Sequence, residues 1–120
     1  MAQPKTPLRI YHNPRCSKSR ETLELLRSRG LEPEVIEYLR EPPDECTLAQ
    51  LLLQLGLEPR ELIRQQEDLY TELDLDKREH TRAELIRLMV EHPILIERPI
   101  VVCGQRARLG RPPEQVLEIL

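Results

Sequence analysis

Apolar and polar positions in the first third of the chain alternate between short β-prone runs and a longer helical pattern. Residues 8–11 form one β-prone run and residues 33–39 form another. Between them, residues 16–29 carry leucines at helical spacing among charges, and Gly30 follows where a helix commonly ends. Pro42-Pro43 breaks the second run. This strand–helix–strand order predicts a pair of parallel strands.

The middle third has the pattern of consecutive helices. Thr47-x-x-Gln50 has the form of a capping box and predicts a helix that ends near Gly56. A proline suits the first turn of the next helix, which we expect over residues 59–64. A second capping box, Thr81-x-x-Glu84, predicts a further helix that Pro93 closes.

The last quarter returns to β-prone residues. Residues 100–103 are apolar and mostly β-branched, Gly104-Gln105 can form a two-residue turn, and residues 106–109 read as the returning strand. A terminal helix is expected over residues 114–120. The hairpin therefore adds antiparallel strands to the parallel pair.

This order of elements fits an α/β fold with a mixed four-stranded sheet and helices on both faces, the thioredoxin/glutaredoxin-like arrangement. A length of 120 residues suits one domain, and we expect a single thioredoxin-like domain over residues 1–120. The helices of the middle third are expected to form an insertion at approximately residues 42–95.

Composition narrows the function classes. Charged residues make up 32% of the chain, but the net charge of −3 argues against nucleic acid as a partner. The apolar runs are too short to span a membrane, and residues 1–7 lack the apolar core of a signal peptide. We therefore expect a cytoplasmic protein with neither a membrane nor a nucleic-acid partner.

The three cysteines, Cys16, Cys46 and Cys103, form an odd set without Cys-x-x-Cys or any metal-binding spacing. No metal site is predicted. Cys16 stands where a strand gives way to a helix, and Arg15, Lys18 and Arg20 add positive charge. Helix N-termini and neighbouring cations lower the pKa of thiols and favour the thiolate. These polar surroundings favour an activated nucleophile over a cysteine that only packs the junction.

Two polar neighbours bear on how Cys16 works. His12 could add positive charge or accept the thiol proton, or it could simply bond its own turn. Ser19 occupies the position three after Cys16, so no local disulfide can close. An oxidised Cys16 must then be resolved by an outside thiol, or by Cys46 or Cys103. We favour the outside thiol, since Cys103 reads as a packing residue and nothing near Cys46 suggests activation.

With these residues in place, the chain resembles the glutaredoxin-coupled arsenate reductase family over essentially its full length. The motifs that carry the resemblance are Tyr11-His12-Asn13-Pro14-x-Cys16, Arg64 within Arg60-Glu61-Leu62-Ile63-Arg64, His92-Pro93-Ile94-Leu95-Ile96-x-Arg98-Pro99-Ile100-Val101-Val102, and Arg108-Leu109-x-Arg111-Pro112. The first and third motifs are long enough that the probability of matching both by chance is very small.

The resemblance implies a thioredoxin-like fold and a thiol-dependent reduction of arsenate to arsenite. Cys16 would attack arsenate, His12 would help to keep it ionised, and Asn13 and Ser19 are secondary candidates. The resemblance also implies glutathione as co-substrate and glutaredoxin as partner, with no bound cofactor. A Cys16–glutathione disulfide would remain after arsenite leaves.

Three arginines, Arg64, Arg98 and Arg111, would surround the oxyanion, and Pro99 would follow a cis peptide bond. Without the resemblance, each arginine has an interpretation that involves no binding role. Arg64 lies in a charged stretch typical of solvent-exposed residues, and Arg98 and Arg111 merely precede prolines. Their functional assignment rests on the resemblance. Forked guanidiniums do match the geometry of a tetrahedral oxyanion.

The chain also departs from the family pattern. Ser17-Lys18-Ser19 stands where better-known members carry Gly-Thr-Ser, and Cys103-Gly104-Gln105 differs from their Thr-Pro turn. Two alternatives therefore stay open: a glutathione-dependent thiol-disulfide oxidoreductase and a non-enzymatic redox sensor that binds a protein partner. The retained arginines count against the first, and Ser19 counts against the second.

Overall fold

The computed structural model describes residues 7–76 and 79–120, so the signal-peptide argument concerns residues that lie mostly outside this part. The chain divides into two compact units. Unit 1 combines the residues up to Glu37 with Arg98–Leu120, and unit 2 is Tyr38–Glu97. The helical insertion expected at residues 42–95 falls within unit 2.

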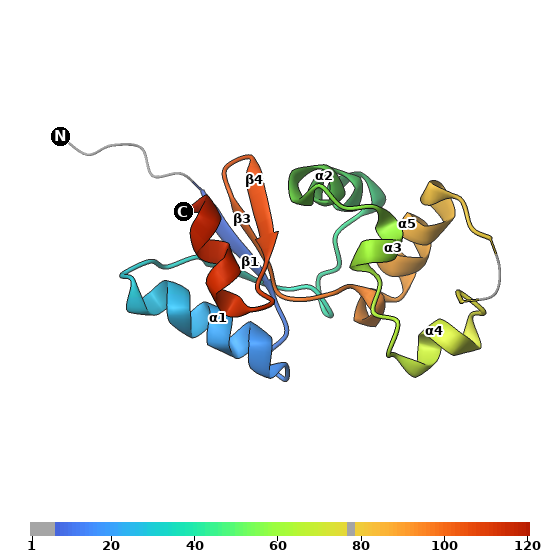
Figure 1. Ribbon diagram of the computed structural model, residues 1–120, viewed down its shortest axis with the longest axis horizontal. Coiled ribbons are helices and arrows are strands. Elements are labelled where there is room, and N and C mark those ends of the chain that lie inside the picture. Colours follow the sequence, from blue (N-terminus) through green and yellow to red (C-terminus); the bar gives the residue numbers. More distant parts are fainter. Residues whose placement is uncertain (1–6, 77–78) are drawn as a thin grey trace. The chain divides into compact units, whose positions relative to one another are not determined.

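Unit 1 contains a four-stranded sheet of order β2-β1-β3-β4 (Figure 1). Its strands are β1 (Leu8–His12), β2 (Glu34–Glu37), β3 (Ile100–Cys103) and β4 (Arg106–Leu109). The β1 and β2 strands are parallel, and the pairs β1–β3 and β3–β4 are antiparallel. This is the mixed four-stranded sheet that the sequence predicted. The turn between β3 and β4 is the expected Gly104-Gln105, with Gly104 at φ +63°.

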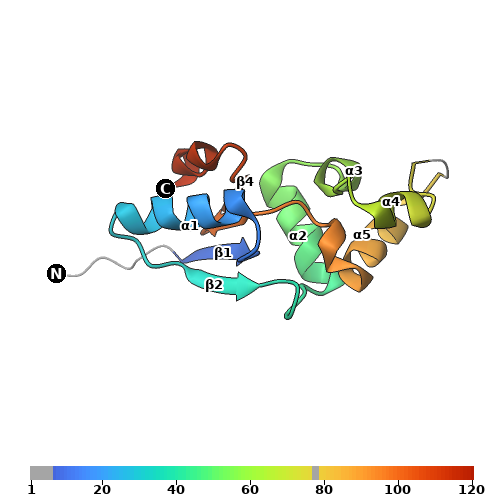
Figure 2. The ribbon, with the colours of Figure 1, turned by 90° about the horizontal axis from the view of Figure 1, so that it is seen from below.

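Two helices cover one face of this sheet: α1 (Ser17–Ser28) and η2 (Pro113–Ile119) (Figure 2, blue and red). The core between them and the sheet consists of buried aliphatic side chains, which are Ile10, Leu23, Leu26, Val101, Val116 and Ile119. The expected terminal helix is a 3₁₀ helix rather than an α-helix. With three residues per turn, that geometry places Val116 and Ile119 on the same side, where both are buried.

Unit 2 is helical: α2 (Glu45–Leu55), α3 (Pro59–Leu62), α4 (Asp68–Glu72), α5 (Arg82–Glu91) and η1 (Pro93–Leu95) (Figure 1). The predicted capping box of α5 is present, because Thr81 Oγ1 accepts from Glu84 N and Glu84 Oε1 accepts from Thr81 N. The end of α2 at Gly56 is also as predicted, with φ +71°.

Two expectations for unit 2 are wrong. The α2 helix is capped by Asp44 instead of Thr47, since Asp44 Oδ1 accepts from Thr47 N at 2.7 Å and the helix begins at Glu45. The helix expected over residues 59–64 ends at Leu62. Ile63 is extended and pairs with Ile96, so Arg64 lies outside the helix. Asp44, which is close in sequence, sets the start of α2. Ile96, which is distant in sequence, sets the end of α3 through its pairing with Ile63.

No helix in the part of the chain that the structure describes has the length and apolar character needed to span a bilayer.

Candidate active site

A tight loop connects β1 to α1 and carries Cys16. Cys16 is the N-cap residue of α1, with φ −95° and ψ 123°. Asn13 builds the loop in two ways: its carbonyl oxygen accepts from Cys16 N at 3.0 Å, and its Oδ1 accepts from Arg15 N at 3.0 Å. Such side-chain to backbone bonds are the usual means by which asparagine fixes a turn. Cys16 is therefore held at the start of α1, partly exposed, where backbone N–H groups favour an anion.

A buried hydrogen-bond network lies beneath this loop. Ser19, on the first turn of α1, has its hydroxyl 2.8 Å from His12 Nδ1, and the same oxygen accepts from Asn13 N at 2.9 Å. All three residues are buried, with Ser19 fully inaccessible. The arrangement is satisfied when the hydroxyl donates to an unprotonated Nδ1, which leaves the imidazole proton on Nε2. Ser19 thus joins the end of β1, the loop and α1.

Burial lowers the pKa of His12 below its ordinary value of 6.5, and the nearby Arg27 and Arg20 act in the same direction. Only Glu37 opposes them. His12 is consequently uncharged at neutral pH. Within the described residues, its side-chain hydrogen bond goes to Ser19 and not to Cys16. Of the roles that the sequence left open for His12, addition of positive charge is the one that these surroundings disfavour.

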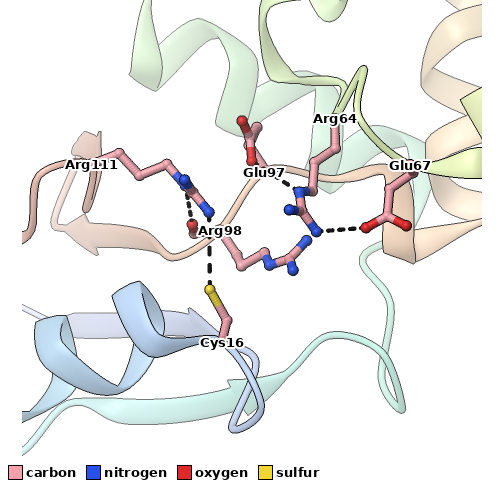
Figure 3. Close-up of polar contacts among 6 residues, drawn as sticks. All are labelled: Cys16, Arg64, Glu67, Glu97, Arg98 and Arg111. Atoms are coloured by element: carbon pink, nitrogen blue, oxygen red, sulfur yellow. Dashed lines mark hydrogen bonds and ion pairs between the residues drawn. The ribbon is translucent and has the colours of Figure 1, made fainter.

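Arg111 brings a guanidinium to the cysteine (Figure 3). Its Nη2 lies 4.0 Å from Cys16 Sγ, while its Nε donates to the carbonyl oxygen of Arg98 at 2.9 Å. The Arg98–Pro99 and Arg111–Pro112 peptide bonds are both cis. The second of these was not expected from the sequence. Cys16, Arg111 and the main chain of Arg98 thus meet in unit 1.

Gly110 explains why Arg111 lies so close to α1. A Cβ at Gly110 would overlap Thr22 Oγ1 and would lie 2.8 Å from Pro99 Cγ. Gly110 N also donates to Pro99 O at 2.9 Å. Only glycine permits this approach between the end of β4, the Pro99 segment and α1. The role of Gly110 was not predicted from the sequence, although a glycine directly before a predicted site arginine was the available signal.

Arg64 belongs to unit 2 and is held by two carboxylates (Figure 3). Its Nη1 lies 2.6 Å from Glu67 Oε1, and its Nε lies 3.3 Å from Glu97 Oε1. The Arg64 side chain is 17% exposed. The expectation of a solvated side chain, drawn from its charged surroundings alone, is therefore wrong. The two glutamates were also missed, because one of them lies thirty-three positions away along the chain.

The remaining cysteines have different surroundings. Cys103 is partly buried against the core of unit 1 and pairs with Leu8, at the opposite end of β1 from the Cys16 loop. Cys46 is exposed on α2 of unit 2. Among the described residues, no group of three or more histidines, cysteines and acidic residues is placed to hold a metal ion.

A β2-β1-β3-β4 sheet, a cysteine at the N-cap of the first helix and a cis-proline before β3 define the thioredoxin-like class of thiol proteins. The family model described as the ArsC family matches residues 11–119, and this chain belongs to the ArsC family. The family-level prediction from the sequence is thereby confirmed.

Similar proteins include several called arsenate reductases. "Uncharacterized protein YfgD" of Escherichia coli is 59% identical over 114 residues, which cover 94% of this chain and 96% of that protein. An "Arsenate reductase" of Haemophilus influenzae is 47% identical over 112 residues, covering 92% and 97% respectively. The solved structure "Arsenate reductase from Vibrio cholerae" is 54% identical, covers 98% of this chain and 100% of its own, and superposes with a TM-score of 0.94.

Proposed function

We propose that this protein reduces arsenate to arsenite with Cys16 as nucleophile and with glutathione and glutaredoxin as the source of electrons. The observation that carries the proposal is the contact between Arg111 and Cys16 at the start of α1. Membership of the ArsC family and the similarity to proteins called arsenate reductases support the choice of oxyanion. A reaction that consumes reduced thiols also suits the cytoplasm.

The reaction proceeds in two stages. The Cys16 thiolate attacks arsenic, a sulfur–arsenic bond forms, and one arsenate oxygen leaves as water after taking up protons. A glutathione thiolate then attacks Cys16 Sγ. A sulfur–sulfur bond forms, and the electron pair of the broken sulfur–arsenic bond stays on arsenic, which leaves as arsenite. Glutaredoxin then reduces the Cys16–glutathione disulfide by thiol–disulfide exchange.

The cationic residues lower the electrostatic barrier to attack of the thiolate on arsenate. A thiolate that approaches arsenate meets like-charge repulsion, and guanidiniums offset it while holding the oxygens in fixed orientation. The contact of Arg111 with Cys16 Sγ supports this role for Arg111. Arg98 is added to the proposed oxyanion site, and the assignment of Arg64 to it rests on the family resemblance. Within unit 2, Glu67 and Glu97 orient the Arg64 guanidinium.

His12, Asn13 and Ser19 act in this proposal as positioning residues. Their network fixes the loop that presents Cys16, and the neutral His12 keeps its remaining N–H as a donor. A neutral imidazole adds no positive charge beside Cys16. Electrostatic support for the thiolate then comes from the helix start and from Arg111.

The test is a coupled assay with glutathione, glutaredoxin, glutathione reductase and NADPH. We expect arsenate-dependent NADPH oxidation that the substitution Cys16→Ser abolishes, with Cys46→Ser as the matched control that retains activity. No arsenate-dependent rate at millimolar arsenate would refute the proposal. In that case, turnover of a glutathionylated peptide without arsenate would favour the thiol-disulfide oxidoreductase. Inactivity in both assays would favour the redox sensor.

A further inference from the structure

Arg15 is an exposed arginine beside the nucleophile, and its guanidinium has no hydrogen bond or ion pair within residues 7–76 and 79–120. Its backbone is fixed, because Arg15 N donates to Asn13 Oδ1. Adjacent Cα atoms are about 3.8 Å apart, so the Arg15 side chain starts directly beside that of Cys16. The Arg15 backbone is thus held by a hydrogen bond, while its guanidinium has no partner among the described residues.

Three other cations near Cys16 are already engaged. Arg20 Nη1 donates to the carbonyl oxygen of Pro14 at 2.9 Å. Lys18 Nζ lies 3.6 Å from Glu21 Oε2. Arg111 contacts the sulfur itself and the carbonyl oxygen of Arg98. Arg15 therefore remains available for a charged group that arrives together with a second reactant.

A groove of about 560 Å³ between α1 and η2 is lined by Glu21, Glu24 and Glu114 as well as by Lys18. Its carboxylates disfavour the binding of an anionic thiol there.

We infer that Arg15 recognises a carboxylate of the thiol that reacts at Cys16, and so makes the protein selective for anionic thiols such as glutathione. The inference rests on the proposed function for the identity of that thiol. Arg15 is a specificity residue here, since it contacts the incoming molecule away from the reacting sulfur atoms. Its action is electrostatic at a solvent-exposed site, where a single ion pair changes a rate by about two- to fivefold.

A first experiment isolates this step from arsenate. The reduced protein reacts either with oxidised glutathione, which is anionic, or with 2-hydroxyethyl disulfide, which is neutral. In each reaction the Cys16 thiolate displaces one half of the disulfide as a thiolate, and peptide mass spectrometry follows modification of Cys16. We expect Arg15→Gln to lower the rate ratio of oxidised glutathione to the neutral disulfide by about two- to fivefold at low salt.

The matched control is Arg29→Gln. Arg29 is also exposed and without a side-chain partner in the described part of the chain, but it follows α1 about 20 Å from Cys16 at 1.5 Å per residue. The rate ratio should stay unchanged in this variant. An unchanged ratio in Arg15→Gln, or an equal fall in both variants, would overturn the inference.

A second experiment uses arsenate turnover. Arg15→Gln should raise the KM for glutathione by about two- to fivefold and leave the KM for arsenate unchanged, while the rate with 2-mercaptoethanol should fall less than the rate with glutathione. A rise in the KM for arsenate would instead place Arg15 in the oxyanion site and overturn the inference. Absence of arsenate turnover in the unmodified protein would refute the proposed function, while the disulfide experiment would still decide the role of Arg15.

Discussion

In the Cys16 loop of unit 1, Asn13, Ser19 and His12 bind one another and the backbone, and Arg111 binds a carbonyl oxygen and the sulfur. In unit 2, by contrast, Arg64 is held by the carboxylates of Glu67 and Glu97. We propose that the first region presents its positive charge to a ligand. The second places positive charge between negative ones, so the removal of Arg64 affects the fold as well as any ligand.

The largest expected effect is a loss of activity on removal of Arg111, which distinguishes Arg111 from Arg64. Arg111→Ala should lower kcat/KM for arsenate by about 10²–10³, the usual result of removing one oxyanion donor, while the thermal midpoint stays nearly constant. Arg108→Ala is the control, because Arg108 pairs with Glu118 on the surface of the same unit. A loss of activity in Arg111→Ala that is no larger than in Arg108→Ala would remove Arg111 from the oxyanion site.

The Cys16 loop should depend on Ser19 for its stability. Ser19→Ala leaves the backbone N–H of Asn13 and the Nδ1 of His12 buried without their partner. Unsatisfied buried groups cost about 1–3 kcal/mol, so we expect the free energy of unfolding to fall by about that amount in urea titrations. Ser28→Ala, which removes an exposed hydroxyl bonded to Leu25 O, should change it by much less. Equal losses in the two variants would contradict the importance of the network.

Arg64 provides the opposite test. Arg64→Ala leaves two partly buried carboxylates without their shared cation, and we expect the free energy of unfolding to fall by about 1–2 kcal/mol, between the values for exposed and buried pairs. Arg82→Ala breaks the exposed pair with Glu58 and should cost less than about 1 kcal/mol. The double variant Arg64→Ala/Glu67→Gln should recover part of the loss. No recovery would show that the charge pair is not the cause.

The sequence predicts a feature of these regions well when the residues that determine it are neighbours along the chain, and poorly when they are far apart. The position of Cys16 at a helix start and the stop at Gly30 follow from neighbouring residues, and both agree with the structure. The boundary near Arg64 was wrong because Ile63 pairs with Ile96, a contact that no local pattern reveals. The α4 helix was not predicted, since residues 68–72 hold only two apolar positions among polar ones. The close packing at Gly110 likewise depends on Thr22 and Pro99, which are distant in sequence.

The smallest expected effect is the dependence of stability on pH through His12. Because burial lowers the pKa of His12 in the native state, the unfolded chain binds the proton more readily. The stabilisation is complete above the ordinary value of 6.5, and it is lost as the pH falls below that value toward the lower native pKa. The free energy of unfolding should therefore decline as the pH falls below about 6.5. His12→Asn, whose amide oxygen can still accept from Ser19, should flatten this decline, whereas His92→Asn, at a half-buried position in unit 2, should leave it in place. If the stability of both variants depended on pH in the same way, the pKa of His12 would be equal in the native and unfolded states. That result would contradict a neutral His12 in the Cys16 loop.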